Sequence, residues 1–379
     1  MTVNNNRASN NPFLTYGYAG PEYFCDRKEE TANLITALRN GRNVTLTAPR
    51  RMGKTGLIKN AFYHIDAEES NAACIYIDIF ATRNLHDFTQ MFGKAVLEGL
   101  QTTGEMLLSK ITSVLSHCRP TVSIDPMTGA ASLSLNIAPD HEEQTLGEIF
   151  SYIASSKRRC FISIDEFQQI TQYPEQKTEA LMRSYIQFCP NANFVFSGSS
   201  RHLMAEMFMS AKRPFYQSTQ LMELHAIGQD AYHDFADGFF RKRGGHISAG
   251  AFGHAYSCFE GGTWYMQAVL NRLYERYDSV ETDGLVDETI AQLVEENATS
   301  YQTLISLLPN KQLDLLKAIA AEDVVATPNN GDFIRKYNLK AASSVSSAIK
   351  SLTEKELVYR TERGYTVYDR LFSLWLKRL

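Results

Sequence analysis

A lysine and a threonine end a short polar loop whose surroundings are suited to binding phosphate. The loop follows the β-branched run 44–47 and precedes a stretch with apolar residues at helical spacing. Backbone N–H groups of such a loop, and the N-terminus of the following helix, attract anions. We expect Lys54 to reach the β- and γ-phosphates of a nucleotide and Thr55 to bind Mg²⁺. The residues expected to bind nucleotide in this loop are Ala48, Pro49, Arg50, Arg51, Met52, Gly53, Lys54, Thr55 and Gly56.

The first position of the loop departs from the usual pattern, G-x-x-x-x-G-K-[ST]. Ala48 replaces the first glycine and adds a methyl group to a turn that glycine enters freely. A glycine-rich turn before an ordinary helix is the alternative interpretation. The strand before the loop, the helix after it and the acidic residues downstream favour a nucleotide site.

Two adjacent acids end a second apolar run, residues 160–164. Burial of a carboxylate beside a strand is costly unless the charge is used. We therefore expect Asp165 to hold the Mg²⁺ shell, directly or through water, and Glu166 to polarise the water that attacks the γ-phosphate. A simple acidic turn at the end of a strand is the alternative.

A third apolar run, residues 193–196, ends in small polar residues at the edge of a sheet where ligands collect in α/β folds. Ser199 is the candidate hydroxyl for sensing the γ-phosphate; a helix cap is its alternative. Arg213 is the candidate arginine for transition-state charge, although it could equally be a surface side chain. Arg27 could lie near the base of the nucleotide, and a solvated first helical turn is the alternative.

The elements that position these residues alternate between strand and helix patterns, which predicts a parallel α/β sheet. Alternation on both sides of residues 125–129 predicts a β-hairpin inserted at about 118–140. Strand patterns become sparse after residue 221, and three helices followed by a hairpin at 357–368 predict a winged helix. The expected division is a flexible or loosely docked arm at 1–20, a core at 21–225, a helical lid at 226–308 and a winged helix at 309–379.

Composition excludes several classes of protein. The 379 residues have a formal net charge of -4, which does not suit a globally basic protein that coats nucleic acid. No apolar run has the length of a membrane span, and the polar first residues do not form a signal peptide. The 6 cysteines show no C-x-x-C spacing, which indicates free thiols in a reducing compartment. We expect a cytoplasmic protein without a membrane partner.

These linked motifs resemble the archaeal-type ATPase family, within the AAA+/STAND group of P-loop ATPases, over roughly residues 22–379. The resemblance implies a helical lid over ATP. It also implies a sheet of five strands. If the strands are numbered along the chain, their order across the sheet is 5-1-4-3-2. The segments that carry the resemblance are 24–30, 48–55, 164–168, 196–200, 260–265 and 368–376.

Three further positions, besides Ala48, depart from the family pattern. Asp26 stands where the family has glycine, and Trp264 stands where a proline usually lies near adenine. An indole could stack on a purine, and Gly262 is a position of close approach to the nucleotide. The arginine that the family places after the stretch 214–216 is absent, so the resemblance assigns no arginine acting between subunits.

The sequence predicts an Mg²⁺-dependent ATP-binding protein and ATPase that acts as a nucleotide-driven conformational switch. The alternative is an NTP-gated DNA-binding or protein-adaptor module with negligible hydrolysis. Residues 309–379 carry 12 Lys and Arg against 8 Asp and Glu, but Lys350 is the chief cation on the third helix. The sequence leaves open whether the winged helix binds DNA or protein, and whether the chain forms homo-oligomers.

Overall fold

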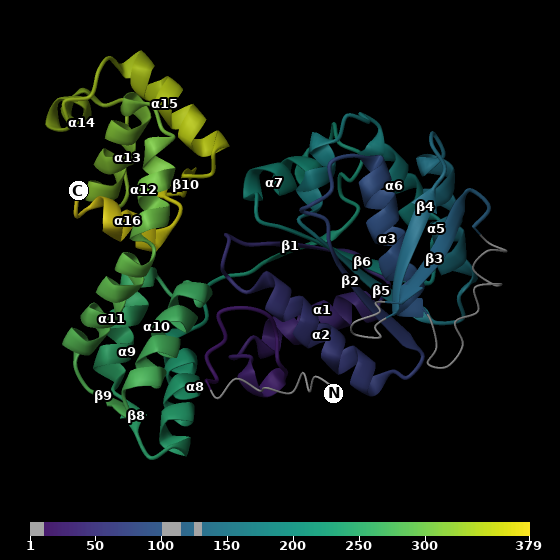
Figure 1. The fold of residues 1–379 in the computed structure, drawn as a ribbon, viewed down its shortest axis with the longest axis horizontal. Helices are drawn as coiled ribbons and strands as arrows, with labels where there is room; N and C mark the ends of the chain where they lie inside the picture. Colours follow the sequence, from purple (N-terminus) through teal and green to yellow (C-terminus); the bar gives the residue numbers. More distant parts are fainter. Residues whose placement is uncertain (1–10, 101–114, 125–130) are drawn as a thin grey trace. The chain divides into compact units, whose positions relative to one another are not determined.

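The computed structural model divides the chain into two compact units (Figure 1). The first comprises Met1–Phe235 and Gly261–Trp264, and the second comprises Ala236–Glu260 and Tyr265–Leu379. The structure describes residues 11–100, 115–124 and 131–379. Within these ranges, no helix is both long enough and apolar enough to cross a membrane.

A parallel sheet of five strands forms the centre of the first unit. Its order is β2-β5-β6-β1-β7, so the fourth central strand along the chain lies between the phosphate-loop strand and the acidic strand. This order confirms the one implied by the family resemblance. The strands are β1 (Val44–Thr47), β2 (Ala72–Asp78), β5 (Arg159–Asp165), β6 (Ala192–Gly198) and β7 (Gln220–Glu223).

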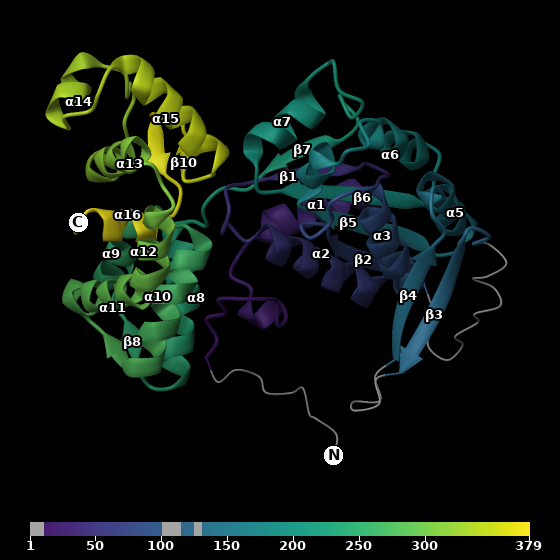
Figure 2. The same cartoon turned by 45° about the horizontal axis from the view of Figure 1, so that its top comes forward.

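Helices cover both faces of the sheet, which explains why its central strands are almost continuously apolar (Figures 1 and 2). One core contains side chains of α1 (Lys28–Arg39) and α2 (Lys54–Glu68), packed with those of β1. The core on the other face contains side chains from four helices. These are α3 (Leu85–Leu100), α5 (Glu142–Ser155), α6 (Thr178–Gln187) and α7 (Arg201–Met209).

The predicted hairpin is present as β3 (Cys118–Ile124) and β4 (Ala131–Ile137), which pair antiparallel outside the main sheet. β4 packs along α3 (Figure 2). A Cβ on Gly93 of α3 would lie 2.5 Å from Leu135 Cδ1, so glycine permits this close approach. The predicted turn at 125–129 lies outside the described residues.

The expectation of a flexible or loosely docked arm at 1–20 is wrong for residues 11–20. Phe13 is 0% exposed, and its ring meets the ring of Phe235 edge-on at a centroid distance of 6.4 Å. The Tyr18 hydroxyl donates to Asn60 Oδ1 of α2 at 2.8 Å. Apolar burial and this hydrogen bond fix the segment to the first unit. Residues 1–10 lie outside the described residues.

The chain between the sheet and the winged helix is helical, as predicted. Its last two helices meet at Asn297, whose side-chain amide donates to Leu293 O at 2.7 Å. The elements are α8 (Gln229–Lys242), α9 (Ala249–Phe259), α10 (Thr263–Arg276), α11 (Asp283–Glu296) and α12 (Ala298–Ser306). The strands β8 (His246–Ile247) and β9 (Ser279–Val280) pair in parallel.

Three helices and a hairpin follow in the order predicted for a winged helix. Tyr365 of the hairpin also bridges Val325, which adds a third extended segment beside it. Gly364 has a φ of 140°, and a Cβ there would meet Val325 O at 2.4 Å. The elements are α13 (Asn310–Glu322), α14 (Gly331–Lys336), α15 (Ala342–Glu354), β10 (Val358–Arg360), β11 (Tyr365–Val367) and α16 (Arg370–Leu376).

Candidate functional site

The loop between β1 and α2 holds its lysine inside the protein. Gly53 precedes α2 with a φ of 89°, a left-handed conformation that suits glycine. Lys54 is 7% exposed, and its Nζ donates to Ala48 O at 3.0 Å and to Pro49 O at 3.3 Å. The first residues of the loop thus turn their carbonyl groups toward the ammonium. This geometry holds a buried cation beside the N-terminus of a helix.

Electrostatics make Lys54 a receptive site for an anion. Burial lowers the pKa of its ammonium, while the charges of Asp165 and Glu166 act in the opposite direction. Among the described residues, its hydrogen-bond acceptors are neutral carbonyls. A buried cation is costly without a bonded anion. Phosphate is the anion that the loop and helix N-terminus accommodate best.

Asp165, at the end of β5, lies at the centre of a hydrogen-bond network and is almost fully buried. Its Oδ2 accepts from Thr55 Oγ1 at 3.0 Å and from the Tyr76 hydroxyl at 2.6 Å. Its Oδ1 accepts from Ser197 Oγ at 2.6 Å and from the Glu166 N–H at 3.0 Å. The network joins the phosphate loop to three adjacent strand ends.

Glu166 is held beside the end of β6. Its Oε2 accepts from Ser199 Oγ at 2.8 Å and from Gln168 Nε2 at 2.5 Å. Its backbone has a φ of 55°, an unusual left-handed conformation for glutamate that costs on the order of 1 kcal/mol. A Cβ on Gly198 would lie 2.1 Å from Gln168 Oε1, so glycine leaves room for this amide.

Two segments distant in sequence hold the loop from outside. Arg27 donates through Nη2 to Met52 O at 3.3 Å and through Nη1 to Glu30 at 2.8 Å. Thr263 Oγ1 donates to the same Met52 carbonyl at 3.3 Å. The Trp264 N–H donates to Arg51 O at 2.9 Å, and the Arg51 guanidinium lies 4.1 Å from the centre of the indole ring. Arg51 itself has a φ of 68°.

The structure therefore brings together most of the residues singled out in the sequence. Arg27 is 3% exposed, which excludes the alternative of a solvated helical turn. Gly262 is buried immediately before α10, and Gly56 faces the ring of Phe24. Arg50 acts on Lys54 through its charge. These positions suit contact with a nucleotide, but the contacts themselves remain predictions.

Arg213 occupies a different place from the one expected for a residue at the γ-phosphate. Its Nη2 lies 2.5 Å from Glu179 of α6, and its Nε lies 3.8 Å from Glu206 of α7. Burial raises the pKa of Glu179, and the charge of Arg213 opposes that change. Within the described part of the chain, the guanidinium thus pairs with carboxylates on two helices. Its action at a phosphate remains a prediction without a supporting contact.

Sequence reasoning missed Tyr76, Ser197 and Gln168. Tyr76 precedes the end of β2 by two residues and looked like part of an apolar run; burial and the charge of Asp165 raise the pKa of its hydroxyl. The parallel register that places Tyr76 opposite Ser163, and Asp78 opposite Asp165, explains its reach. Hydroxyl residues near the ends of strands were the available signal.

The oxygen donors at this edge fit Mg²⁺. Thr55 and Asp165 supply a hydroxyl and a carboxylate, the hard ligands that the ion prefers. Among the described residues, no group of three or more His, Cys, Asp and Glu side chains could hold a metal alone. Mg²⁺ commonly binds one or two protein oxygens together with phosphates and water, so this donor set fits the ion.

Comparisons with known proteins agree with this geometry. The family described as "Probable winged helix domain" matches residues 299–378. The structure of the Walker-type ATPase Paby2304 of Pyrococcus abyssi matches with a TM-score of 0.65 and 16% identity, covering 97% of this chain and 100% of that chain. The ORC1 protein of Aeropyrum pernix, solved in complex with DNA, matches with a TM-score of 0.51 and 13% identity, covering 94% of each chain. No curated protein matches the sequence.

The chain therefore has the α/β fold of a Walker-type ATPase. Its C-terminal residues form a winged helix domain. These findings confirm, at the level of the fold, the resemblance to archaeal ATPases that the motifs carry. Identities this low describe architecture, so activity must be argued from the site.

Proposed function

We propose that this protein binds ATP with Mg²⁺ and hydrolyses it as a nucleotide-driven conformational switch. The observation that carries the proposal is the buried ammonium of Lys54, which donates to two loop carbonyls at the N-terminus of α2. A phosphate group bound in the loop would pair with this ammonium. Thr55 would hold the Mg²⁺, and Asp165 would hold it directly or through water; the bound ion neutralises phosphate charge.

The residues of the site divide the remaining work. Lys54 would bind the β- and γ-phosphates, while the N–H groups of the loop would orient them. Glu166 would accept a proton from the attacking water. The water oxygen bonds to the γ-phosphorus while the bond from phosphorus to the β–γ bridging oxygen breaks. The proton then passes to phosphate, which leaves ADP and inorganic phosphate. Ser199 would report the presence of the γ-phosphate, because it donates to Glu166.

The test is phosphate release from Mg²⁺–ATP, measured beside ATP binding by calorimetry. Glu166→Gln should abolish turnover and leave binding within about threefold of wild type, because the amide keeps the shape but loses the basic oxygen. Lys54→Ala should weaken binding at least tenfold, as expected for the loss of a buried charge–phosphate contact. Hydrolysis by Glu166→Gln at the wild-type rate would show that the catalytic assignment is wrong.

A second candidate is a nucleotide-gated binding module with negligible hydrolysis. The hydrogen bonds from Ser199 and Gln168 to Glu166 favour it, because they occupy Oε2 and leave only Oε1 of the carboxylate to accept a proton. ATP binding without turnover in wild type and in Glu166→Gln would support this candidate. The bound partner would then be sought at the winged helix.

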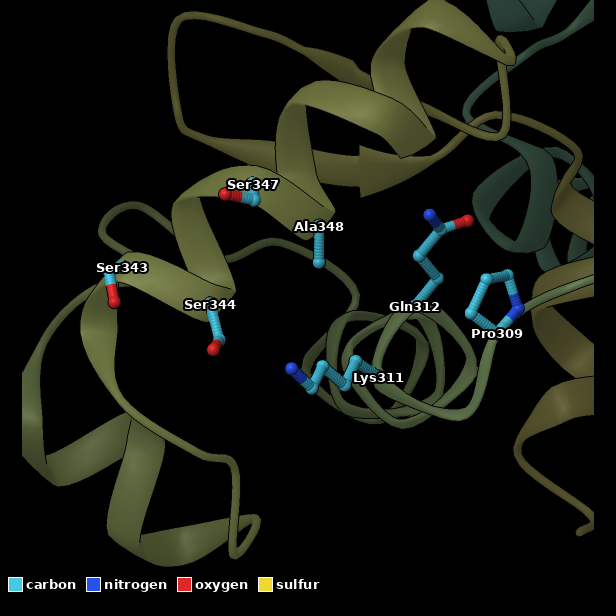
Figure 3. Close-up of a pocket in the computed structure, with 7 residues that line it drawn as sticks. All are labelled: Pro309, Lys311, Gln312, Ser343, Ser344, Ser347 and Ala348. Atoms are coloured by element: carbon cyan, nitrogen blue, oxygen red, sulfur yellow. The ribbon is translucent and has the colours of Figure 1, made fainter.

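The winged helix favours a protein over DNA as that partner. Lys350, the chief cation on α15, lies 3.9 Å from Glu354. An open groove of about 310 Å³ lies between the N-terminal ends of α13 and α15, with Lys311 and Ser344 on its two sides (Figure 3). Further cations of the domain are already paired with carboxylates, namely Arg335 with Asp332, Lys336 with Glu322, Arg363 and Arg370 with Glu260, and Lys377 with Asp323.

The electrophoretic mobility of duplex DNA at low salt distinguishes a DNA partner from a protein partner. Unchanged mobility with added protein, in the presence and absence of ATP, is the expected result. A salt-dependent shift that Lys350→Glu removes would establish the DNA-binding alternative. The division into a core at 21–225, a lid at 226–308 and a winged helix at 309–379 remains part of this proposal.

A further inference from the structure

The carboxylate of Asp165 has little hydrogen-bonding capacity left. A carboxylate offers about four lone-pair positions on its two oxygens. Thr55 and Tyr76 donate to Oδ2, at 3.0 Å and 2.6 Å. Ser197 Oγ and the Glu166 N–H donate to Oδ1, at 2.6 Å and 3.0 Å. With these four bonds in place, Asp165 cannot turn an oxygen toward a metal ion without losing a donor.

Tyr76 differs from the other three donors in its origin. Thr55 belongs to the phosphate loop, whereas Ser197 and Glu166 lie on or beside the strands that form the acidic edge. Tyr76 comes from β2, where the parallel register sets it beside Ser163 of β5. Its ring packs against the core between the sheet and α2, and Lys59 Nζ lies 5.1 Å from the ring centre. Packing therefore fixes the hydroxyl on Oδ2.

We propose that Tyr76 is a positioning residue that makes the site selective for Mg²⁺ over Ca²⁺ by keeping Asp165 outside direct contact with the ion. The inference rests on the proposed function, because it assumes that a metal–nucleotide complex binds here. The Thr55 hydroxyl donates a hydrogen bond to Asp165, which leaves the lone pairs of its oxygen available to the ion. Asp165 then reaches the ion through water, at a distance set by Tyr76.

The chemistry of the two ions explains the selectivity. Mg²⁺ is small, demands octahedral geometry and retains several water molecules. Ca²⁺ takes six to eight oxygen ligands and binds carboxylates directly in flexible geometry. A carboxylate that reaches the ion only through water suits Mg²⁺ and deprives Ca²⁺ of a direct oxygen ligand. Releasing Oδ2 lets Asp165 rotate and contact the ion, which favours Ca²⁺.

The test is calorimetric titration of ATP into wild type and Tyr76→Phe, with Mg²⁺, with Ca²⁺ and with EDTA. Tyr76→Phe should lower the ratio of the Ca²⁺–ATP to the Mg²⁺–ATP dissociation constant by roughly fivefold or more, the size expected from one hydrogen bond to a charged group. Affinity in EDTA should stay the same. Tyr185→Phe is the matched control, because its hydroxyl donates to Glu143 O away from the acidic edge.

A double-mutant cycle shows whether the effect passes through Asp165. In the Asp165→Asn background, the change of Tyr76 to Phe should leave the ratio unaltered, since the rotating carboxylate is gone. If Tyr76→Phe unfolds, Tyr76→Met removes the hydroxyl with a flexible apolar side chain. An unchanged or raised ratio in a folded variant overturns the inference while Mg²⁺–ATP binding stands. Absence of ATP binding by wild type overturns the proposed function itself.

Discussion

The indole ring of Trp264 lies against the guanidinium of Arg51, whose carbonyl also accepts the Trp264 backbone N–H. The side chain and the backbone of Arg51, a residue of the phosphate loop, thus both contact the first turn of α10. A loop that rearranges around phosphate must alter this pair. Trp264 is one of 2 tryptophans in the chain, so its fluorescence can report that change.

We predict that ATP changes the emission of Trp264. Trp375→Phe leaves Trp264 as the single tryptophan, and its emission should shift or quench with the dissociation constant found by calorimetry. The physical reason is that the cation beside an indole influences its electronic environment. The Lys54→Ala form of this variant is the control and should show no change at the same ATP concentration. Constant emission at saturating ATP would mean that the pair stays fixed.

Arg27 should contribute more to stability than a surface arginine. Arg27→Ala removes the buried donor to Met52 O and should lower the free energy of unfolding by about 1–3 kcal/mol, measured by urea denaturation. Arg27→Ala should also weaken ATP binding, because the phosphate loop loses the hydrogen bond that holds Met52 O. Arg39→Ala is the matched control: its partners are Glu68 and Glu69, it is partly exposed, and its loss should cost less than about 1 kcal/mol.

Gly198→Ala should displace the residues around Glu166. The added Cβ would lie 2.1 Å from Gln168 Oε1 and 2.8 Å from Met204 Sδ, so both side chains must move. We expect a loss of about 1–3 kcal/mol in the free energy of unfolding and a fall in phosphate release that exceeds any fall in ATP affinity. Gly228→Ala, where a Cβ meets nothing within 4 Å, should change neither. Equal behaviour of the two variants would contradict the steric argument.

The buried thiols predict how stability depends on alkaline pH. Burial raises the pKa of Cys160 to about 11 and that of Cys189 to about 12. Because the unfolded thiol ionises near pH 9, unfolding releases protons above that pH and native stability falls until the folded thiol ionises. Below pH 9 this contribution is fully present. Urea unfolding between pH 8 and pH 10.5 should therefore show a smaller loss of stability for Cys189→Ala than for wild type.

Thiol chemistry gives an independent check on the same burial. Thiol reagents attack the thiolate, so Cys160 and Cys189 should react slowly in the native protein at pH 8 and readily in urea. Peptide mapping after brief alkylation identifies the modified positions. Rapid native modification of Cys189 would contradict the buried site.

Local patterns were enough to predict the positions of Lys54, Thr55, Asp165, Glu166 and Ser199, because each follows a strand whose apolar run is visible in the sequence. The strand order followed from the family resemblance. Tyr76 could not be assigned, since its role depends on the register between β2 and β5. The ion-pair partners of Arg213 could not be assigned for a related reason: Glu179 and Glu206 come from two helices whose packing no local pattern reveals.

The segment Gly261–Trp264 belongs to the first unit, while the residues on either side of it belong to the second. The polypeptide therefore crosses the boundary between units three times, and no single cut separates them. A truncation after residue 235 would discard Thr263 and Trp264, which bind carbonyls of the phosphate loop. In evolutionary terms the two units are not interchangeable modules. An exchange of C-terminal halves between related proteins would also replace part of the support of the nucleotide loop, so both halves must change together.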